Sequence, residues 1–383
     1  MKFPLYLDHN ATTPCDPRVV KEMLPWFTER FGNASSIHYP LGWLSEEAVE
    51  TAREQVAQLI GASPKEIVFT SGATEAINMA IRGLVEANQD KGNHIITVAT
   101  EHKAVLDTCR ALEAKGIETT YLPVDNEGLI DLDLLERTIR KDTVLIAVMM
   151  ANNETGVIQP VAEIANIAKR HGVFFLSDWV QAVGKIKVTV RDLGVDLMPI
   201  SAHKMYGPKG MGALYISSKF SKANLVSQIT GGGHEMGLRS GTVNVPGIVG
   251  FGKAAEIALN QLTEDSRRLA KFRDTLEEGI LSLEGTKLNG DKDHRLPHVC
   301  NISFEGVEGK ALLIAINKEL AVSSGSACSS ITTKPSHVLK AMGLEDELAR
   351  STIRFGLGRS TTRDQVEFAV AYVKETVERL RGG

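Results

Sequence analysis

The sequence predicts an α/β protein with a large domain built on a mainly parallel sheet and a smaller α+β domain after it. Two observations favour this fold class. From about residue 45, short strands rich in β-branched residues alternate with amphipathic helices, as in β-α-β units. After about residue 250 this order ends, and a long helical stretch leads into strands that alternate apolar with polar residues.

Length and composition set the broad class. The 383 residues are enough for two domains, and 43% hydrophobic and 23% charged residues are ordinary for a globular enzyme. A formal net charge of −4, with no block of lysine or arginine, argues against a nucleic-acid partner. The longest apolar run, Val144 to Ala151, is too short to span a bilayer, and no secretory leader is expected after Met1, so no membrane partner is expected either.

The cysteines indicate the compartment. Cys15, Cys109, Cys300 and Cys328 form no CxxC pair. This spacing disfavours a zinc site and a disulfide framework, so we expect no bound metal and a reducing, cytoplasmic location.

The N-terminal part begins with polar loops. Residues 6–14 are dense in hydrogen-bonding side chains, and these residues alone predict a capped loop before a helix from Pro17 to Phe27. A second polar loop at 33–38 precedes an amphipathic helix from Ser45 to Leu59.

A glycine-bearing turn follows the first predicted strand, Ile67 to Thr70. The turn, Ser71-Gly72-Ala73-Thr74-Glu75, opens a helix that is expected to run to about Asn88. A strand, a glycine turn and a helix N-terminus form a site for phosphate, because the N–H groups of the first turn lack partners in the helix. An ordinary helix cap explains the same residues, and for this stretch alone that interpretation is favoured.

Further strands and helices alternate along the chain. Strands are predicted by apolar, β-branched runs at 94–98, 119–123, 144–150, 173–176, 196–200 and 213–216. Helices are predicted between them by amphipathic patterns at 103–115, 132–140 and 161–170. After the change near residue 250 we expect helices at 253–283 and 309–319, strands at 299–304 and 352–357, and a last helix capped by Thr362.

Polar residues follow several of these strands directly. They are His102, Asn152-Asn153-Glu154, Asp178 with Gln181, and Lys204. The carboxyl ends of parallel strands share one edge of a sheet, where ligands bind. A lysine there, between His203 and a Gly/Pro-rich turn, is a candidate Schiff-base amine, although a solvated loop lysine is the more common role for any lysine taken alone.

A lysine, an aspartate and a phosphate-binding turn are together the parts of a pyridoxal phosphate site. Lys204 can hold the cofactor covalently, and Asp178 can keep the pyridine nitrogen protonated, so that the ring draws electrons from the substrate. The sequence therefore indicates pyridoxal 5′-phosphate as the cofactor.

Motifs spread over nearly the whole chain resemble one family, the cysteine desulfurases of the class V aminotransferase superfamily, close to NifS and IscS proteins. The matching segments are 6–13, 69–75, 100–102, 152–156, Asp178 with Gln181, 201–204, 239–242, 323–328 and 353–355. The resemblance implies a two-domain, pyridoxal-phosphate-dependent enzyme of fold type I. It implies that residues 1–14 join the small domain, that 15–255 form the large cofactor-binding domain, and that 256–383 form the small domain.

The resemblance also implies roles for individual residues. Lys204 would carry the cofactor, and His102 would stack on its ring and help to move protons. The remaining cofactor-binding residues would be Ala73, Thr74, Asp178, Gln181, Ser201 and His203, with Thr242 reaching the neighbouring subunit of a homodimer. Asn153 and Arg354 would bind the substrate carboxylate.

Cys328 separates a desulfurase from other members of the superfamily. Its small, polar neighbours predict an exposed loop, where a thiolate can act as a nucleophile. The resemblance implies that it takes sulfur from L-cysteine as a persulfide, leaves L-alanine, and passes the sulfur to an acceptor such as an iron–sulfur scaffold protein. A selenocysteine lyase, another class V aminotransferase, or a sulfur-handling protein that acts mainly by binding remain alternatives.

Two residues depart from the family pattern. Met236 stands where an arginine is common, which we expect to weaken a phosphate, dimer or partner contact. Trp179 stands where a small residue usually follows the aspartate, and its ring is expected either to narrow the cofactor pocket or to repack the wall behind it.

Overall fold

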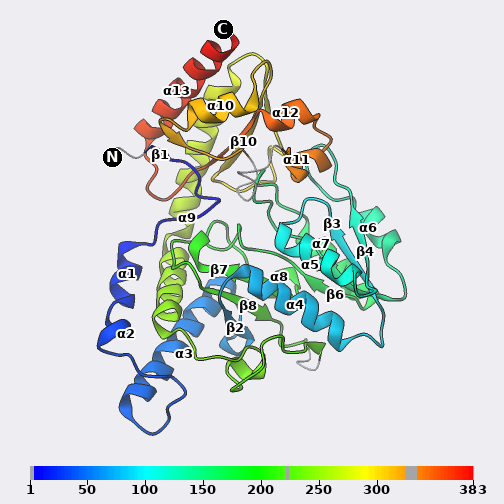
Figure 1. Cartoon of the computed structure of the whole chain (residues 1–383), viewed down its shortest axis with the longest axis vertical. Helices are drawn as coiled ribbons and strands as arrows, with labels where there is room; N and C mark the ends of the chain where they lie inside the picture. Colours follow the sequence, from blue (N-terminus) through cyan, green and yellow to red (C-terminus); the bar gives the residue numbers. More distant parts are fainter. Residues whose placement is uncertain (1–3, 221–223, 325–333, 383) are drawn as a thin grey trace.

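A seven-stranded sheet forms the centre of the larger part of the protein (Figure 1). The computed structural model describes residues 4–220, 224–324 and 334–382. In spatial order the strands are β2 (Ile67–Thr70), β8 (Gly212–Ile216), β7 (Leu197–Ser201), β6 (Phe174–Leu176), β5 (Thr143–Ala147), β3 (His94–Val98) and β4 (Glu118–Leu122). All neighbouring strands are parallel except β8, which is antiparallel to both β2 and β7. The prediction of a mainly parallel sheet is confirmed.

Helices cover both faces of this sheet. They are α3 (Pro40–Ile60), α4 (Ala73–Ala87), α5 (Lys103–Glu113), α6 (Leu132–Thr138), α7 (Val161–His171) and α8 (Val190–Leu193). Neighbouring strand residues point to opposite faces, so that Ile95 packs with α4 and α5 whereas Ile96 packs with α3 and α7. Because both faces are buried, the strands are continuous apolar runs, as the sequence has them.

The C-terminal part has a smaller sheet. Its antiparallel strands, in spatial order, are β12 (Thr352–Gly356), β10 (Val299–Phe304) and β9 (Thr286–Leu288). The helices around it are α10 (Gly309–Ile316), α11 (His337–Ala341), α12 (Asp346–Arg350) and α13 (Arg363–Arg381). The N-terminal strand β1 (Leu5–Tyr6) pairs in parallel with β11 (Leu320–Ala321), so β1 lies in this part.

One long helix, α9 (Val245–Leu281), runs through both parts (Figure 1). Its first half packs in the core of the large sheet through residues such as Phe251, and its second half packs in the C-terminal core through residues such as Leu276. It begins eight residues before the predicted start, with Asn244 as the N-cap, whose side chain accepts from the Gly247 N–H. In the described part of the chain, none of the helices combines the length and apolar character that a bilayer-spanning segment needs.

The predicted helix from Pro17 to Phe27 is wrong in one respect, because the structure has two short helices there. They are α1 (Pro17–Met23) and α2 (Pro25–Thr28). Pro25 has no N–H to donate to the preceding turn, so the hydrogen-bond ladder is interrupted at this residue.

Candidate active site

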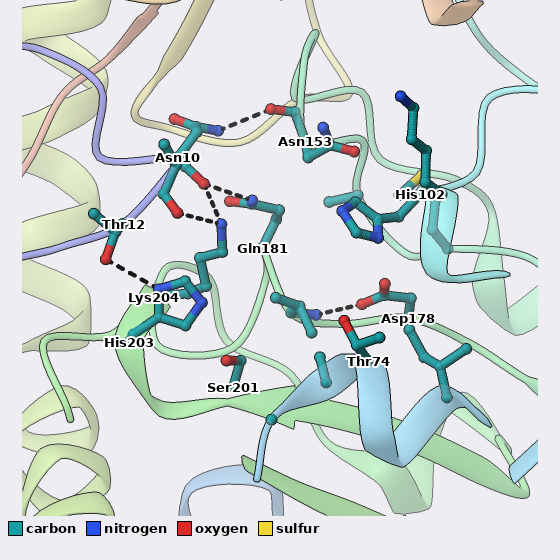
Figure 2. A pocket seen from close by; sticks show the side chains of 18 of the residues that line it. Asn10, Thr12, Thr74, His102, Asn153, Asp178, Gln181, Ser201, His203 and Lys204 are labelled. Atoms are coloured by element: carbon teal, nitrogen blue, oxygen red, sulfur yellow. Dashed lines mark hydrogen bonds between the residues drawn. The ribbon is translucent and has the colours of Figure 1, made fainter. Parts of the chain in front are cut away.

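A cavity of about 520 Å³ opens at the carboxyl edge of the large sheet (Figure 2). Most of the predicted site residues line it, namely Ala73, Thr74, His102, Asn153, Asp178, Gln181, Ser201, His203, Lys204 and Arg354. They come from segments scattered over the sequence. The edge of the large sheet brings most of them together, and Arg354 comes from β12 of the smaller sheet. The volume suits a ligand the size of a cofactor with a small substrate.

One wall of the cavity is the N-terminus of α4. Gly72 precedes this helix with a φ of 155°, and among the described residues no side chain caps the helix. The backbone passes close to β8 here, since a Cβ at Gly212 would lie 2.6 Å from the Cα of Gly72. Uncapped N–H groups at a glycine turn, beside the hydroxyl of Thr74, form an anion cradle.

Lys204 lies in a short 3-10 turn, η2 (Ala202–Lys204), which follows β7 directly. Its Nζ donates to the main-chain carbonyl of Ala11 at 2.8 Å and to that of Asn10 at 2.5 Å. Nearby, His203 contacts the Oγ1 of Thr12 through its Nδ1 at 3.0 Å. Burial lowers the pKa of His203 to about 4, so its ring is neutral near pH 7.

Asp178 is a buried acid that lines the pocket. It follows β6, and its Oδ1 accepts from the Val180 N–H at 2.9 Å. Burial raises the pKa of Asp178 to about 6, while the Val180 N–H and the charge of Lys204 partly offset this rise. Gln181 is anchored by its Nε2, which donates to the main-chain carbonyl of Asn10 at 3.0 Å.

His102 is the N-cap of α5. Its Nδ1 accepts from the Ala104 N–H at 3.1 Å, so the neutral ring carries its hydrogen on Nε2. Burial, and then the positive charge of Lys204, lowers the pKa of His102 to about 4. Figure 2 shows His102 and Lys204 on different sides of the same cavity, each extending toward it.

Arg354 lies in β12 and lines the pocket. Its side chain is 1% exposed; one guanidinium nitrogen donates to the Asn153 carbonyl at 2.9 Å and another to the Asp8 carboxylate at 2.7 Å. The Asn10 side chain also donates to the Asn153 carbonyl, at 3.4 Å. Arg354 is therefore fixed between the N-terminal segment and the turn after β5.

Two predicted site residues are not among the described residues that line the cavity. Thr242 is exposed and lies outside the cavity of its own chain. Cys328 falls in 325–333, outside the described residues.

The two residues that depart from the family pattern lie away from the cavity. Trp179 is fully buried in the main hydrophobic core rather than lining the cavity, so its ring packs behind the wall. Met236 is 42% exposed, while its neighbour Glu235 forms a buried ion pair with Arg53 at 2.8 Å.

The structure adds pocket residues to which the sequence assigns no role. Asn10 supplies a main-chain acceptor to Lys204, and no side-chain pattern signals that contact. Glu154 is buried, and its carboxylate accepts from the Ser336 Oγ at 2.5 Å. His337 contacts the main-chain carbonyl of Glu101 through its Nε2 at 2.9 Å. Glu154 lies shortly after the strand predicted at 144–150, which is a signal in the sequence, whereas no sequence pattern points to Ser336 or His337.

These residues fit pyridoxal phosphate. The uncapped N-terminus of α4 suits a phosphate group, Lys204 suits a covalent linkage to an aldehyde, and Asp178 suits a protonated ring nitrogen. The fit rests on the donors and acceptors of the cavity and on its size.

Comparison with known proteins agrees with this fold and pocket. Residues 5–368 match the aminotransferase class-V family. A solved structure of a NifS-like protein superposes with a TM-score of 0.92 and 38% identity, covering 99% of this chain and 100% of the other. The structure of SspA in complex with cysteine superposes with a TM-score of 0.82 and 38% identity, covering 92% of this chain and 98% of that one. The chain thus belongs to the aminotransferase class-V family.

Sequence relatives narrow the assignment within that class. The chain is 54% identical over 381 residues to the cysteine desulfurase IscS of Methylococcus capsulatus, covering 100% of this chain and 94% of the relative. It is 53% identical over 382 residues to the IscS of an Anaeromyxobacter species, with the same coverage. The chain belongs to the cysteine desulfurase family of the NifS and IscS type, which confirms the resemblance seen in the sequence.

Proposed function

We propose that this protein is a cysteine desulfurase that binds pyridoxal 5′-phosphate through Lys204 and converts L-cysteine to L-alanine. The observation that supports this most is the meeting of Lys204, Asp178 and Arg354 around one cavity whose wall is an uncapped helix N-terminus. A carboxylate-binding cation beside a cofactor lysine suits an amino acid as the substrate.

Sulfur passes from the substrate to the thiol of Cys328. The Cβ–S bond of L-cysteine breaks, its electron pair stays on carbon and is protonated, and an S–S bond forms to Cys328. The Cys328 thiol and L-cysteine thereby become a persulfide and L-alanine. The cofactor, when bound, supplies an electron sink that makes the bonds at Cα and Cβ labile.

The residues of the chain bind the substrate and transfer protons to and from it. Arg354 binds the substrate carboxylate with Asn153 beside it, and the Lys204 amine takes the proton from Cα. His102, neutral near pH 7, would stack on the cofactor ring and exchange protons with the substrate. Asp178 would stabilise the protonated ring nitrogen. Ala73, Thr74, Ser201 and His203 would hold the phosphate, and Gln181 would bond the ring hydroxyl.

We further propose a homodimer in which Thr242, which is exposed, reaches the phosphate of the neighbouring subunit. The sulfur acceptor is an iron–sulfur scaffold protein or another thiol acceptor, and the setting is the reducing cytoplasm, where a persulfide remains exchangeable. Residues 15–255 form the cofactor-binding domain, and 256–383 together with 1–14 form the small domain.

The deciding experiment follows the visible spectrum of the purified protein during titration with L-cysteine, with alanine and sulfide assayed in parallel. We expect a cofactor band that shifts with L-cysteine, and alanine formed together with reductant-dependent sulfide. The Lys204→Ala variant should lack both the band of the covalent linkage and turnover. Alanine formed from L-selenocysteine but not from L-cysteine would instead identify a selenocysteine lyase.

A further inference from the structure

Tyr206, two residues after Lys204, has a backbone conformation that a bulky residue rarely adopts. Its φ is +66°, in the left-handed region that favours glycine. Such a conformation persists only where the surroundings determine it, and it is concentrated at functional sites. The ring does not line the cavity among the described residues, so direct contact with a ligand does not explain it.

Main-chain bonds to the N-terminal segment hold Tyr206 in this conformation. Its N–H donates to the Thr13 Oγ1 at 2.8 Å, and its carbonyl accepts from the Asp16 N–H at 2.9 Å. The N–H and the hydroxyl of Thr13 in turn donate to the His203 carbonyl, at 3.0 and 2.8 Å. Residues on both sides of Lys204 are therefore bonded to the segment that supplies the acceptors of its amine.

Tyr206 is 6% exposed, and its ring contacts two basic side chains, Arg359 and Lys185; burial lowers the pKa of Lys185 to about 7, so that amine is only partly protonated near neutral pH. The Arg359 guanidinium carbon lies 4.2 Å from the ring centroid, and the Lys185 Nζ lies 4.6 Å from it. The Arg359 main-chain N–H also donates to the Tyr206 hydroxyl at 2.6 Å. Lys185 is buried, and within the described residues no ion pair is found for its amine, which lies over the face of the Tyr206 ring.

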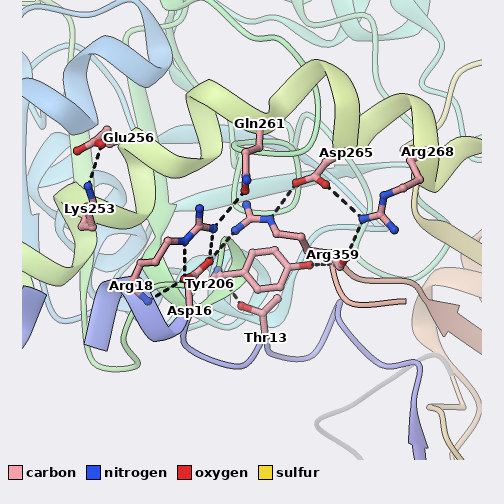
Figure 3. A network of polar contacts seen from close by, with 10 residues as sticks. All are labelled: Thr13, Asp16, Arg18, Tyr206, Lys253, Glu256, Gln261, Asp265, Arg268 and Arg359. Atoms are coloured by element: carbon pink, nitrogen blue, oxygen red, sulfur yellow. Dashed lines mark hydrogen bonds and ion pairs between the residues drawn. The ribbon is translucent and has the colours of Figure 1, made fainter. Parts of the chain in front are cut away.

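Arg359 connects this ring to two other segments (Figure 3). Its guanidinium pairs with Asp265 of α9 at 2.9 Å and with Asp16 at 3.2 Å. Arg359 also lies shortly after β12, the strand that carries Arg354. The ring thus lies where the Lys204 turn, the N-terminal segment, α9 and the segment after β12 meet.

We propose that Tyr206 is a positioning residue for Lys204, whose ring fixes the turn that presents the amine and connects that turn to the strand carrying Arg354. This inference rests on the proposed cofactor linkage at Lys204 and goes beyond the proposed reaction. Loss of the ring leaves Arg359 and Lys185 without their shared contact, so the turn is held only by its main-chain bonds to Thr13 and Asp16 and is less rigid. Lys204 then holds the cofactor in a range of orientations.

Circular dichroism in the cofactor band tests this, because the signal per bound cofactor depends on one fixed orientation. In the purified holoenzyme, Tyr206→Leu should reduce the ellipticity per cofactor to about half or less and lower kcat on the order of tenfold, with KM nearly unchanged. Tyr206→Phe keeps the ring between the two basic side chains and should restore the wild-type ellipticity. Arg359→Gln keeps the ring but removes the guanidinium that contacts it, and it should also reduce the ellipticity. This variant supplies a second test if Tyr206→Leu does not fold.

Tyr215 is the matched control, since it is a tyrosine of β8 that is 4% exposed and does not line the cavity. Tyr215→Leu should lower Tm but leave the ellipticity per cofactor unchanged. Wild-type ellipticity in both Tyr206→Leu and Arg359→Gln would overturn the inference, as would an equal loss in Tyr215→Leu. A wild-type protein without a cofactor band would overturn the inference together with the cofactor assignment. The ellipticity measurement requires only that the cofactor is linked to Lys204. It therefore tests the role of Tyr206 even if L-cysteine is not the substrate.

Discussion

The amine of Lys204 donates a hydrogen bond to the main-chain carbonyl of Asn10, a residue 194 positions earlier in the chain. The proposed cofactor lysine is therefore oriented by the N-terminal segment as well as by its own turn. That segment is held in turn by β12, because the His9 N–H donates to the Gly356 carbonyl at 3.0 Å.

Gly356→Ala should disturb this arrangement. A Cβ at this position would lie 2.4 Å from the Asn10 Oδ1 and 2.9 Å from the His9 main-chain nitrogen. We expect a stability loss of about 1–3 kcal/mol and faster release of the cofactor, because Asn10 must move away. Thermal unfolding and the decay of the cofactor band after dilution measure the two effects. Gly382→Ala, where the nearest atom is 3.4 Å away, is the control, and equal effects in both variants would contradict this account.

Asp178→Asn should raise the stability of the cofactor-free protein near pH 8 but lower the turnover of the holoenzyme. Burial raises the pKa of Asp178 to about 6 from its ordinary 3.8, so the folded protein favours the protonated acid. This contribution to stability is complete below about pH 4 and is lost as the pH rises through about 6. The cofactor-free variant should therefore be more stable than the wild type near pH 8, by about 3 kcal/mol at most, and the two should converge near pH 4.

Urea unfolding of the cofactor-free proteins at the two pH values measures that difference. The same variant should lose on the order of 10²-fold or more in turnover, because an amide cannot hold the ring nitrogen in its protonated form. A variant that is less stable than the wild type near pH 8 would contradict the assigned cost of burying this carboxylate.

Arg354→Lys should raise the KM for L-cysteine by about tenfold or more. The guanidinium contacts Asp8 and the Asn153 carbonyl through separate nitrogens, and a single ammonium cannot keep both contacts while binding a carboxylate. Steady-state kinetics test this, and Arg350→Lys at an exposed position of α12 should leave the KM unchanged. An unchanged KM in Arg354→Lys would place the substrate carboxylate elsewhere.

Cys328→Ser should stop sulfur transfer while the cofactor band remains. We expect alanine formation to fall by about 10²-fold or more, since a serine hydroxyl is a far poorer nucleophile toward sulfur. Cys15→Ser is the control, because burial and the nearby Asp16 charge raise the pKa of the Cys15 thiol and keep it protonated at neutral pH. Alanine production at the wild-type rate in Cys328→Ser would exclude the persulfide role.

The pocket residues that could be predicted from the sequence are those that follow a strand. Lys204, Asp178 and His102 each follow a strand of a mainly parallel sheet, and the common carboxyl edge of such a sheet brings them together. The observed bounds of β3 and β10 are the same as the predicted bounds, 94–98 and 299–304.

The remaining features depend on contacts between distant segments. The two-residue strands β1 and β11 are too short to carry a periodic pattern, and the carbonyl of Asn10 acts through the main chain, which side-chain chemistry does not reveal. The contact between Glu154 and Ser336 joins residues 182 positions apart. The break at Pro25, by contrast, could have been predicted, because proline inside a helical pattern interrupts it.

The pairing of β1 with β11 also sets an order of events during synthesis. Leu5 leaves the ribosome long before its partner Leu320. At about 5–20 residues per second, the first segment waits about 15–60 s for that partner. Lys204 emerges within this interval, before β11 exists to anchor the N-terminal segment beside it. The nascent chain therefore completes its cofactor site late in translation, and a truncated product lacking β11 would leave that site unfinished.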